Sequence, residues 1–226
     1  MFLGKGKDAL TRSGLRDVII FLSAVSVFFY PASFARIGVA FALLVLGSFF
    51  HFISKGVLVR NEVLCRDGIY GVVRHPYYLA NYLIDTGFCV LSGNRYLLLL
   101  YPFLFFWSYG PTLRKEEGTL TEKHGGASVA FMLGTPQVFP DRHSISHLPS
   151  LFAGFSAKRI SPKELARIVR FYAVAFLILG IGRIGAARPL SRHLFSDPAV
   201  IFLFLPAVLL YGASAIILKI PGRYRG

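Results

Sequence analysis

Acidic residues, cysteines and the turns that bind nucleotides in soluble enzymes are all scarce in this sequence. Its 226 residues include 11 Asp and Glu against 25 Lys and Arg. The two cysteines, Cys65 and Cys89, provide neither a disulfide framework nor a metal-binding pair, and they leave the redox compartment open. No glycine-rich loop follows a predicted strand, which excludes a soluble dinucleotide-binding fold.

Apolar residues, by contrast, are abundant and gathered into long runs. Hydrophobic residues make up 54% of the chain and charged residues 16%, and the charges are concentrated between the apolar runs. A soluble domain of this length could not bury so much apolar surface, so a bilayer is the expected solvent. Six stretches approach the roughly 20 residues that cross a membrane: Val18 to Ala35, Ile37 to Ile53, Tyr77 to Ser92, Tyr96 to Leu113, Ile168 to Ile184 and Ala199 to Ile220. The sequence therefore predicts an all-α, multi-pass transmembrane protein with about six spans, the first two forming a tight hairpin broken at Arg36.

The formal net charge of +14 indicates a partner of opposite sign. Basic and aromatic residues are not interleaved on a polar face, so nucleic acid is not expected as that partner. Lys and Arg beside an anionic leaflet each gain about 1 kcal/mol. We therefore expect membrane lipids as partners, whereas nothing in the sequence indicates an oligomeric state.

The distribution of basic residues predicts that both termini are cytoplasmic. Most of the 25 Lys and Arg fall before the first span, in residues 54–76, in residues 114–167 or after the last span. The predicted outer side carries Arg36, Arg95, Arg183, Arg188 and Arg192. Three of these lie at the end of the fifth apolar stretch or between it and the sixth, so complete crossing by that hairpin stays open. The basic, glycine-containing first residues lack a cleavage signal, so we expect the first span to be retained.

A stripe of polar residues begins where the third apolar stretch starts. Pro76 suits the first position of a helix, which places Arg74 and His75 at its mouth. Free backbone donors there, with the Arg74 guanidinium, could hold a carboxylate such as that of a methionine. His75, Tyr78, Tyr82 and Asp85 then recur at steps of three and four residues, flanked by Asn81. Such a stripe should face a cavity.

Asp85 has two interpretations. A carboxylate inside a span costs about 2.5–3.5 kcal/mol unless it meets a partner or water, which favours a functional site. Alternatively, Asp85 lies near the outer interface, bonded to Asn81 or paired with Arg95.

The second polar stretch begins with adjacent carboxylates, Glu116 and Glu117, directly after the fourth apolar run. They could accept hydrogen bonds from ribose hydroxyls or an amine. An acidic pair at this place is also typical of a solvated helix end.

Together the two stretches resemble the isoprenylcysteine carboxyl methyltransferase family and its phospholipid-methylating relatives. The first family motif is matched by Gly68, Tyr70, Arg74, His75, Pro76, Tyr78 and Ala80. The second is matched by Glu116, Glu117, Leu120, His124, Gly125, Phe131, Pro136 and Pro140. The chain departs from the family pattern at four places: Ala80 for a glycine, His124 for an aromatic residue, Ser128 for a tyrosine and Gln137 for a basic residue.

The resemblance implies a site for S-adenosylmethionine (SAM) inside a helical membrane domain, entered from the cytoplasmic side, with the acceptor arriving from the bilayer. It implies no metal. The predicted cofactor-binding residues are Tyr70, Arg74, His75, Pro76, Tyr78, Ala80, Asn81 and Glu117, and the predicted catalytic residues are Arg74, Glu116 and Glu117. The predicted organisation is an N-terminal transmembrane hairpin (residues 1–59), a methyltransferase core (60–140), and a cytoplasmic linker with a two-span extension (141–226).

The function predicted in this way is SAM-dependent methyl transfer to an amphiphilic small-molecule acceptor, either a prenylcysteine-type carboxylate or a phospholipid amine. It would take place in the cytoplasmic membrane of a bacterium or the endoplasmic reticulum of a eukaryote. Two alternatives stay open. One is an NADPH-dependent oxidoreductase, because sterol reductases are similar around an Arg-His-Pro-x-Tyr motif, and the other is a membrane anchor or transport component without turnover.

Two other patterns have simpler interpretations. His143 and His147 have a spacing that could bind a metal on a helix, but the serine-rich context and missing third ligand favour a solvated loop. Ser161, Pro162 and Glu164 precede an apolar run in the arrangement of a helix start, so we expect no site there.

Overall fold

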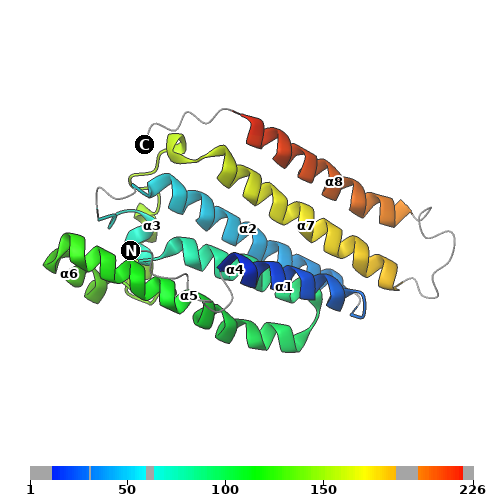
Figure 1. Cartoon of the computed structure of the whole chain (residues 1–226), viewed down its shortest axis with the longest axis horizontal. Coiled ribbons are helices and arrows are strands. Elements are labelled where there is room, and N and C mark those ends of the chain that lie inside the picture. Colours follow the sequence, from blue (N-terminus) through cyan, green and yellow to red (C-terminus); the bar gives the residue numbers. More distant parts are fainter. Residues whose placement is uncertain (1–11, 31, 60–63, 187–197, 221–226) are drawn as a thin grey trace, which may run out of the picture.

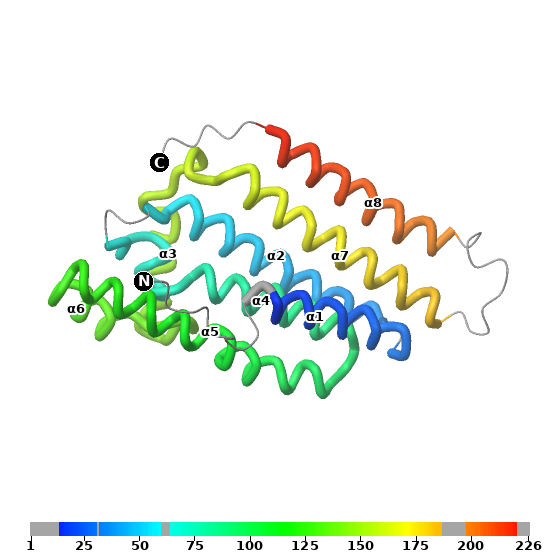
Figure 2. The backbone as a smooth tube through the Cα atoms, viewed as in Figure 1, coloured from blue at the N-terminus to red at the C-terminus, as the bar shows by residue number. Residues whose placement is uncertain are grey.

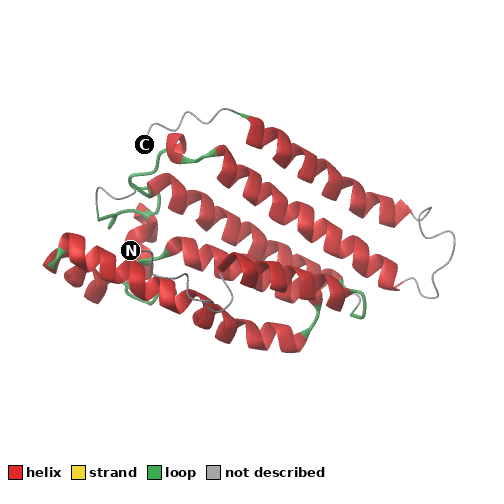
Figure 3. Cartoon of the chain, in the orientation of Figure 1, coloured by secondary structure: helices red, strands yellow, loops and turns green. Residues whose placement is uncertain are grey.

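The protein is a bundle of helices (Figure 1). The computed structural model describes residues 12–30, 32–59, 64–186 and 198–220, and within these ranges it contains helices and loops but no strand (Figure 3). The elements are α1 (Arg12–Val27), α2 (Phe34–Val57), α3 (Ile69–Val72), α4 (Pro76–Ser92), α5 (Arg95–His124), α6 (Gly126–Gly134), the 3₁₀ helices η1 (Ser144–Ser150) and η2 (Ala157–Arg159), α7 (Pro162–Ala186) and α8 (Pro198–Lys219). The all-α prediction is confirmed for this part of the chain.

The long helices lie side by side with similar axes. Helix α7 lies between α8 and α2, and α4 packs against α2, α1 and α5 (Figure 2). Helix α1 also contacts α7. The end of α2, the start of α4, the end of α5 and the start of α7 meet at one end of the bundle, near α3 and α6 (Figure 1). Four segments far apart in sequence therefore bring their polar ends together.

Three of the described helices are long and apolar enough to cross a membrane: α2, α7 and α8. Each of the six predicted apolar stretches falls largely in a different helix, but α1 and α4 have only 16 and 17 residues. The protein is an integral membrane protein, whereas six crossings and cytoplasmic termini stay predictions. Arg188 and Arg192 of the predicted outer loop lie outside the described residues.

The break in the first hairpin was predicted wrongly. Helix α1 ends at Val27 and α2 begins at Phe34, so Arg36 lies inside the first turn of α2 and does not separate two spans. The reason is local, because the Ser33 hydroxyl caps α2 by accepting a hydrogen bond from the Arg36 backbone N–H at 3.3 Å. The Arg36 side chain turns back and donates to the Tyr30 carbonyl at 2.8 Å.

Helix α5 continues well past the apolar stretch from which it was predicted. Asn94 caps its start by accepting from the backbone N–H groups of Tyr96 and Leu97, and the helix runs to His124. Glu116 and Glu117 therefore lie on a continuous helix, which fixes their direction relative to the bundle. The remainder of the long polar segment contains α6, η1 and η2.

A close approach of α2 and α4 forms the centre of the bundle. Gly47 lies where a Cβ atom would come within 2.7 Å of Ile84 Cγ1 and 2.9 Å of the Ala80 carbonyl oxygen. Both Ala80 and Ile84 are fully buried. The absent side chain of Gly47 thus allows the two backbones to pack directly, as small residues do between membrane helices.

This packing makes Gly47→Ala a destabilising change. The methyl group would overpack the α2–α4 contact, at a cost of about 1–3 kcal/mol in the free energy of unfolding. Gly38→Ala on the same helix is the matched control, since a Cβ atom there meets nothing within 4 Å. Denaturant titration in detergent micelles should show a lower midpoint for Gly47→Ala only, and equal midpoints would contradict the close approach.

Candidate active site

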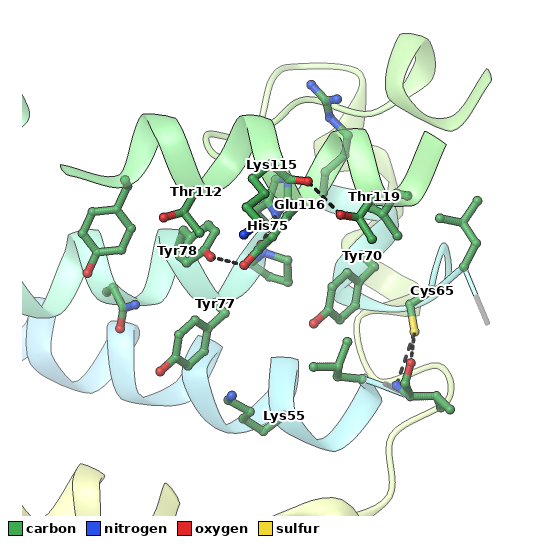
Figure 4. A pocket seen from close by; sticks show the side chains of 18 of the residues that line it. Lys55, Cys65, Tyr70, His75, Tyr77, Tyr78, Thr112, Lys115, Glu116 and Thr119 are labelled. Atoms are coloured by element: carbon green, nitrogen blue, oxygen red, sulfur yellow. Dashed lines mark hydrogen bonds and ion pairs between the residues drawn. The ribbon is translucent and has the colours of Figure 1, made fainter. Parts of the chain in front are cut away.

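A cavity of about 1150 Å³ lies at the end of the bundle where α2, α4, α5 and α7 meet. Its wall carries side chains from all four helices and from α1, and Figure 4 shows several of them pointing into it. Tyr70, Tyr77, Tyr78 and Tyr109 supply aromatic surface, and both acidic and basic groups line the same space. The cavity can therefore accept a ligand with apolar, polar and charged parts.

The Arg74–His75 pair is held by a backbone connection to the second polar stretch. The Arg74 N–H donates to the Pro136 carbonyl at 2.9 Å, and the His75 N–H donates to the Gln137 carbonyl at 3.0 Å. Backbone donors at this helix start were expected to hold an anion, but the amides of Arg74 and His75 are already paired with the residues before Pro140. An anion at this place would be held by side chains.

Glu117 joins both polar stretches from behind the cavity wall. One of its oxygens lies 2.9 Å from Arg74 Nη1, 3.2 Å from His75 Nε2 and 3.0 Å from Gln137 Nε2. Burial would raise the pKa of Glu117, but the hydrogen bonds from His75 and Gln137 and the charge of Arg74 outweigh it and hold the pKa below its ordinary value. Glu117 is therefore an ionised anchor that fixes the two basic side chains.

Glu116, one residue earlier, faces the cavity. It accepts a hydrogen bond from the Tyr78 hydroxyl at 2.5 Å, and its other oxygen lies 3.6 Å from His75 Nδ1. Its side chain is 45% exposed, compared with 18% for Glu117. The His75 ring stacks on Tyr78, and Tyr78 meets Tyr109 edge to face. The adjacent carboxylates thus have different surroundings, one half-buried as an anchor and one open to a ligand.

Residues 19–122 match the model of the isoprenylcysteine carboxyl methyltransferase (ICMT) family. The predicted resemblance to that family is confirmed. The match begins in α1 and ends near the end of α5, so it includes both Arg74–His75 and Glu116–Glu117. Comparison with curated proteins and with solved structures gave no match. The family match indicates a membrane methyltransferase.

Most of the site residues predicted from the ICMT resemblance line the cavity. These are Tyr70, Arg74, His75, Pro76, Tyr78, Asn81 and Glu116. Glu117 lies behind them, as described above. Ala80 is not part of the wall, because it is fully buried against Gly47 of α2. In this structure the small residue of the ICMT motif serves the packing of helices.

The polar stripe on α4 faces the cavity only over its first two turns. Tyr82 packs against Tyr101, Phe105 and Phe139. Asp85 is fully buried, accepts from Arg16 Nε at 2.6 Å and from the Tyr101 hydroxyl at 3.1 Å, and is not part of the cavity wall. The prediction that the whole stripe lines a cavity is wrong.

The proposed partners of Asp85 were also wrong. Arg16 of α1, and not Arg95, neutralises it, and the same guanidinium donates to Asn81 Oδ1 at 3.0 Å. Arg16 reaches this position because α1 packs directly on α4. Its side chain is 14% exposed and also lines the cavity, so the ion pair joins the bundle interior to the site.

The prediction missed a second polar group on the cavity wall, centred on Glu164. Helix α7 begins at Pro162 with Ser161 before it, so the predicted helix start is confirmed. The Glu164 carboxylate nevertheless points inward, where it lies 2.8 Å from His51 Nε2, 3.2 Å from Lys55 Nζ and 2.8 Å from Arg167 Nη1. Glu164, Lys55 and Arg167 line the cavity. The spacing of three residues between Glu164 and Arg167 is a signal that the sequence offered for an ion pair. The sequence alone did not indicate that Lys55 of α2 lies beside the same carboxylate.

His143 and His147 contact each other edge to face at the start and middle of η1, with ring centroids 6.1 Å apart. Over the described part of the chain, no group of three or more His, Cys, Asp or Glu side chains is arranged to hold a metal ion.

Proposed function

We propose that the protein transfers the methyl group of SAM to a lipid-like acceptor in this cavity. The observation that supports the proposal most directly is that two polar stretches, far apart in sequence and with their Arg74–His75 and Glu116–Glu117 pairs both within the ICMT match, meet at one cavity. Tyr78 is hydrogen-bonded to Glu116, while Arg74 and His75 contact Glu117. A membrane anchor without turnover would not require this convergence.

The residues present fit SAM. Binding sites for small molecules commonly have about 300–1000 Å³, so the cavity of about 1150 Å³ has room for the cofactor and part of an acceptor. Arg74 Nε is buried and has no hydrogen-bond partner among the described residues, so the guanidinium retains a donor for a carboxylate. The faces of Tyr77, Tyr78 and Tyr109 offer an environment that attracts a cation such as a sulfonium.

When bound, SAM supplies a methyl group that its sulfonium already activates, so the protein needs mainly to align the acceptor and exclude water. Arg74 and His75 would hold the cofactor, and Glu117 keeps both side chains in one orientation. Glu116 places a negative charge beside Tyr78, where it would stabilise a positively charged ligand. The remaining predicted residues, Tyr70, Pro76 and Asn81, complete this part of the wall.

The nature of the acceptor decides whether a base is needed. A carboxylate, as in a prenylcysteine, is already nucleophilic and needs none. An amine, as in a phospholipid headgroup, must lose a proton, and Glu116 is the carboxylate that faces the cavity and could take it. We propose that the cavity opens to the cytoplasmic side, in agreement with the predicted distribution of basic residues, and that the acceptor enters from the bilayer.

Calorimetry on the purified full-length protein in detergent tests this function. We expect S-adenosylhomocysteine to bind and NADPH not to bind. Tyr78→Phe removes the hydrogen bond to Glu116 and should weaken S-adenosylhomocysteine binding about tenfold. Tyr82→Phe is the matched control on the same helix, because Tyr82 packs outside the cavity, and its binding should equal that of the wild type.

The same protein, incubated with SAM and a total membrane lipid extract, should produce a lipid heavier by one methylene unit in mass spectrometry. Binding of NADPH, with a lipid gaining two hydrogens, would replace the proposal by the reductase alternative. Absence of binding to either cofactor would leave the anchor or transport alternative.

A further inference from the structure

The group around Glu164 combines side chains of α2 and α7 with one side chain of α4. Lys55 ends α2, Glu164 and Arg167 begin α7, and Tyr77 lies in the first turn of α4. Lys55 Nζ lies 4.1 Å from the centroid of the Tyr77 ring, and Arg167 Nη1 is 3.0 Å from the Tyr77 hydroxyl. Helix α7 lies beyond residue 122, where the ICMT match ends. Glu164 and Arg167 therefore lie outside the matched region, whereas Lys55 and Tyr77 lie within it.

Among the described side chains of this group, the positive charges outnumber the negative ones. One carboxylate, Glu164, faces two permanent cations, Lys55 and Arg167, and it also accepts from His51. The side chains of Lys55 and Glu164 are only 12% and 14% exposed, so water screens them weakly. Two cations on the wall of a cavity favour an anionic ligand.

Arg167 still has donors to offer. Its side chain is 43% exposed, and both of its hydrogen bonds to described residues, with Glu164 and Tyr77, are made by Nη1. The Nη2 and Nε groups can therefore bind oxygen atoms of a ligand in the forked geometry typical of arginine with phosphate or carboxylate.

The position of this group separates it from Glu116. In Figure 4 Lys55 approaches from α2, whereas Glu116 and Lys115 approach from α5, with Tyr77 between them. An acidic group paired with Lys55 and Arg167 would lose nucleophilicity, because two cations stabilise its lone pairs. It would anchor the acceptor and not receive the methyl group.

We propose that Lys55 and Arg167, oriented by Glu164, bind an acidic group of the acceptor, a phosphate ester or a carboxylate, at a place apart from the atom that is methylated. The role of this ligand as a methyl acceptor rests on the function proposed above. The acceptor class inferred is an anionic amphiphile that carries its acidic group and its nucleophile at separate positions. Helix α7 then supplies specificity for the acceptor, while α4 and α5 hold the methyl donor.

Binding measurements on the full chain in a neutral detergent test this subsite, with dodecyl phosphate as the anionic amphiphile, dodecanol as its neutral counterpart and inorganic phosphate as the acidic group alone. We expect dodecyl phosphate to bind at least about tenfold more tightly than either of the other two. Arg167→Gln should weaken dodecyl phosphate binding about tenfold or more and leave S-adenosylhomocysteine binding unchanged. Arg167→Lys should retain part of the affinity, since the charge remains.

Arg170→Gln is the matched control, because Arg170 lies one turn further along α7, donates to Ser214 of α8 and is not on the cavity wall. Its dodecyl phosphate affinity should equal that of the wild type. The proposal would be overturned if dodecanol or inorganic phosphate bound as tightly as dodecyl phosphate. It would also be overturned if Arg170→Gln weakened dodecyl phosphate binding as much as Arg167→Gln, or if Arg167→Gln lost S-adenosylhomocysteine binding. Binding of dodecyl phosphate through Arg167 in a protein that binds no S-adenosylhomocysteine would retain the subsite and refute the methyltransferase function.

Discussion

Glu117→Ala should abolish S-adenosylhomocysteine binding and lower the free energy of unfolding by about 2–4 kcal/mol. The variant removes the common partner of Arg74, His75 and Gln137, so Arg74 would lose its anion, and His75 and Gln137 would lose the acceptor that holds them. Calorimetry and denaturant titration measure the two effects. Glu122→Ala, an exposed carboxylate on the same helix, is the control and should change neither.

The pH dependence of the unfolding free energy tests whether Glu117 is ionised in the folded protein. Because the folded protein holds the pKa of Glu117 below its ordinary value of 4.5, the ionised form stabilises the fold fully above that value. This stabilisation is lost as the pH falls through the lowered pKa. The difference in unfolding free energy between wild type and Glu117→Gln should therefore be constant above the ordinary carboxyl pKa and shrink below it. A difference that persists at lower pH would refute the assigned ionisation.

Asp85→Ala should be the most destabilising single change in the bundle, at about 3–5 kcal/mol. It would leave the Arg16 guanidinium without its anion in a region where Asp85 is fully buried, and it would also remove the acceptor of the Tyr101 hydroxyl. Thermal unfolding in detergent micelles measures the loss.

A double variant identifies the cause. Arg16→Met combined with Asp85→Leu removes both charges and fills the space with apolar groups, so it should recover most of the stability that Asp85→Ala loses. If the double variant were as unstable as Asp85→Ala, packing and not the uncompensated charge would explain the loss.

The parts of the structure that the sequence could predict are those governed by local pattern. The apolar runs indicated the helices, Pro76 indicated the start of α4, and Ser161 with Pro162 indicated the start of α7. The convergence of the two ICMT motifs followed from a resemblance, since composition alone contains no information about which helix ends meet.

The parts that failed depend on which helix lies beside which. Asp85 had several cations available in the sequence, and Arg95 was only ten residues away, but the packing of α1 on α4 brings Arg16 to it from 69 residues away. Glu164 satisfied every local rule for a helix start, so its inward direction could be recognised only after α2 and α7 were placed together. In both cases the long-range arrangement decides the role of a polar residue.

The division of the cavity wall between two groups of helices also bears on how such enzymes diversify. The residues that would hold the methyl donor belong to the segment from α3 to α5, inside the matched region, whereas Glu164 and Arg167 belong to α7, which follows that region. Under the proposed function, mutations in α7 would change the choice of lipid without altering the donor residues. A lineage could thus acquire a new substrate by exchanging one carboxy-terminal hairpin, and the inherited chemistry would remain intact.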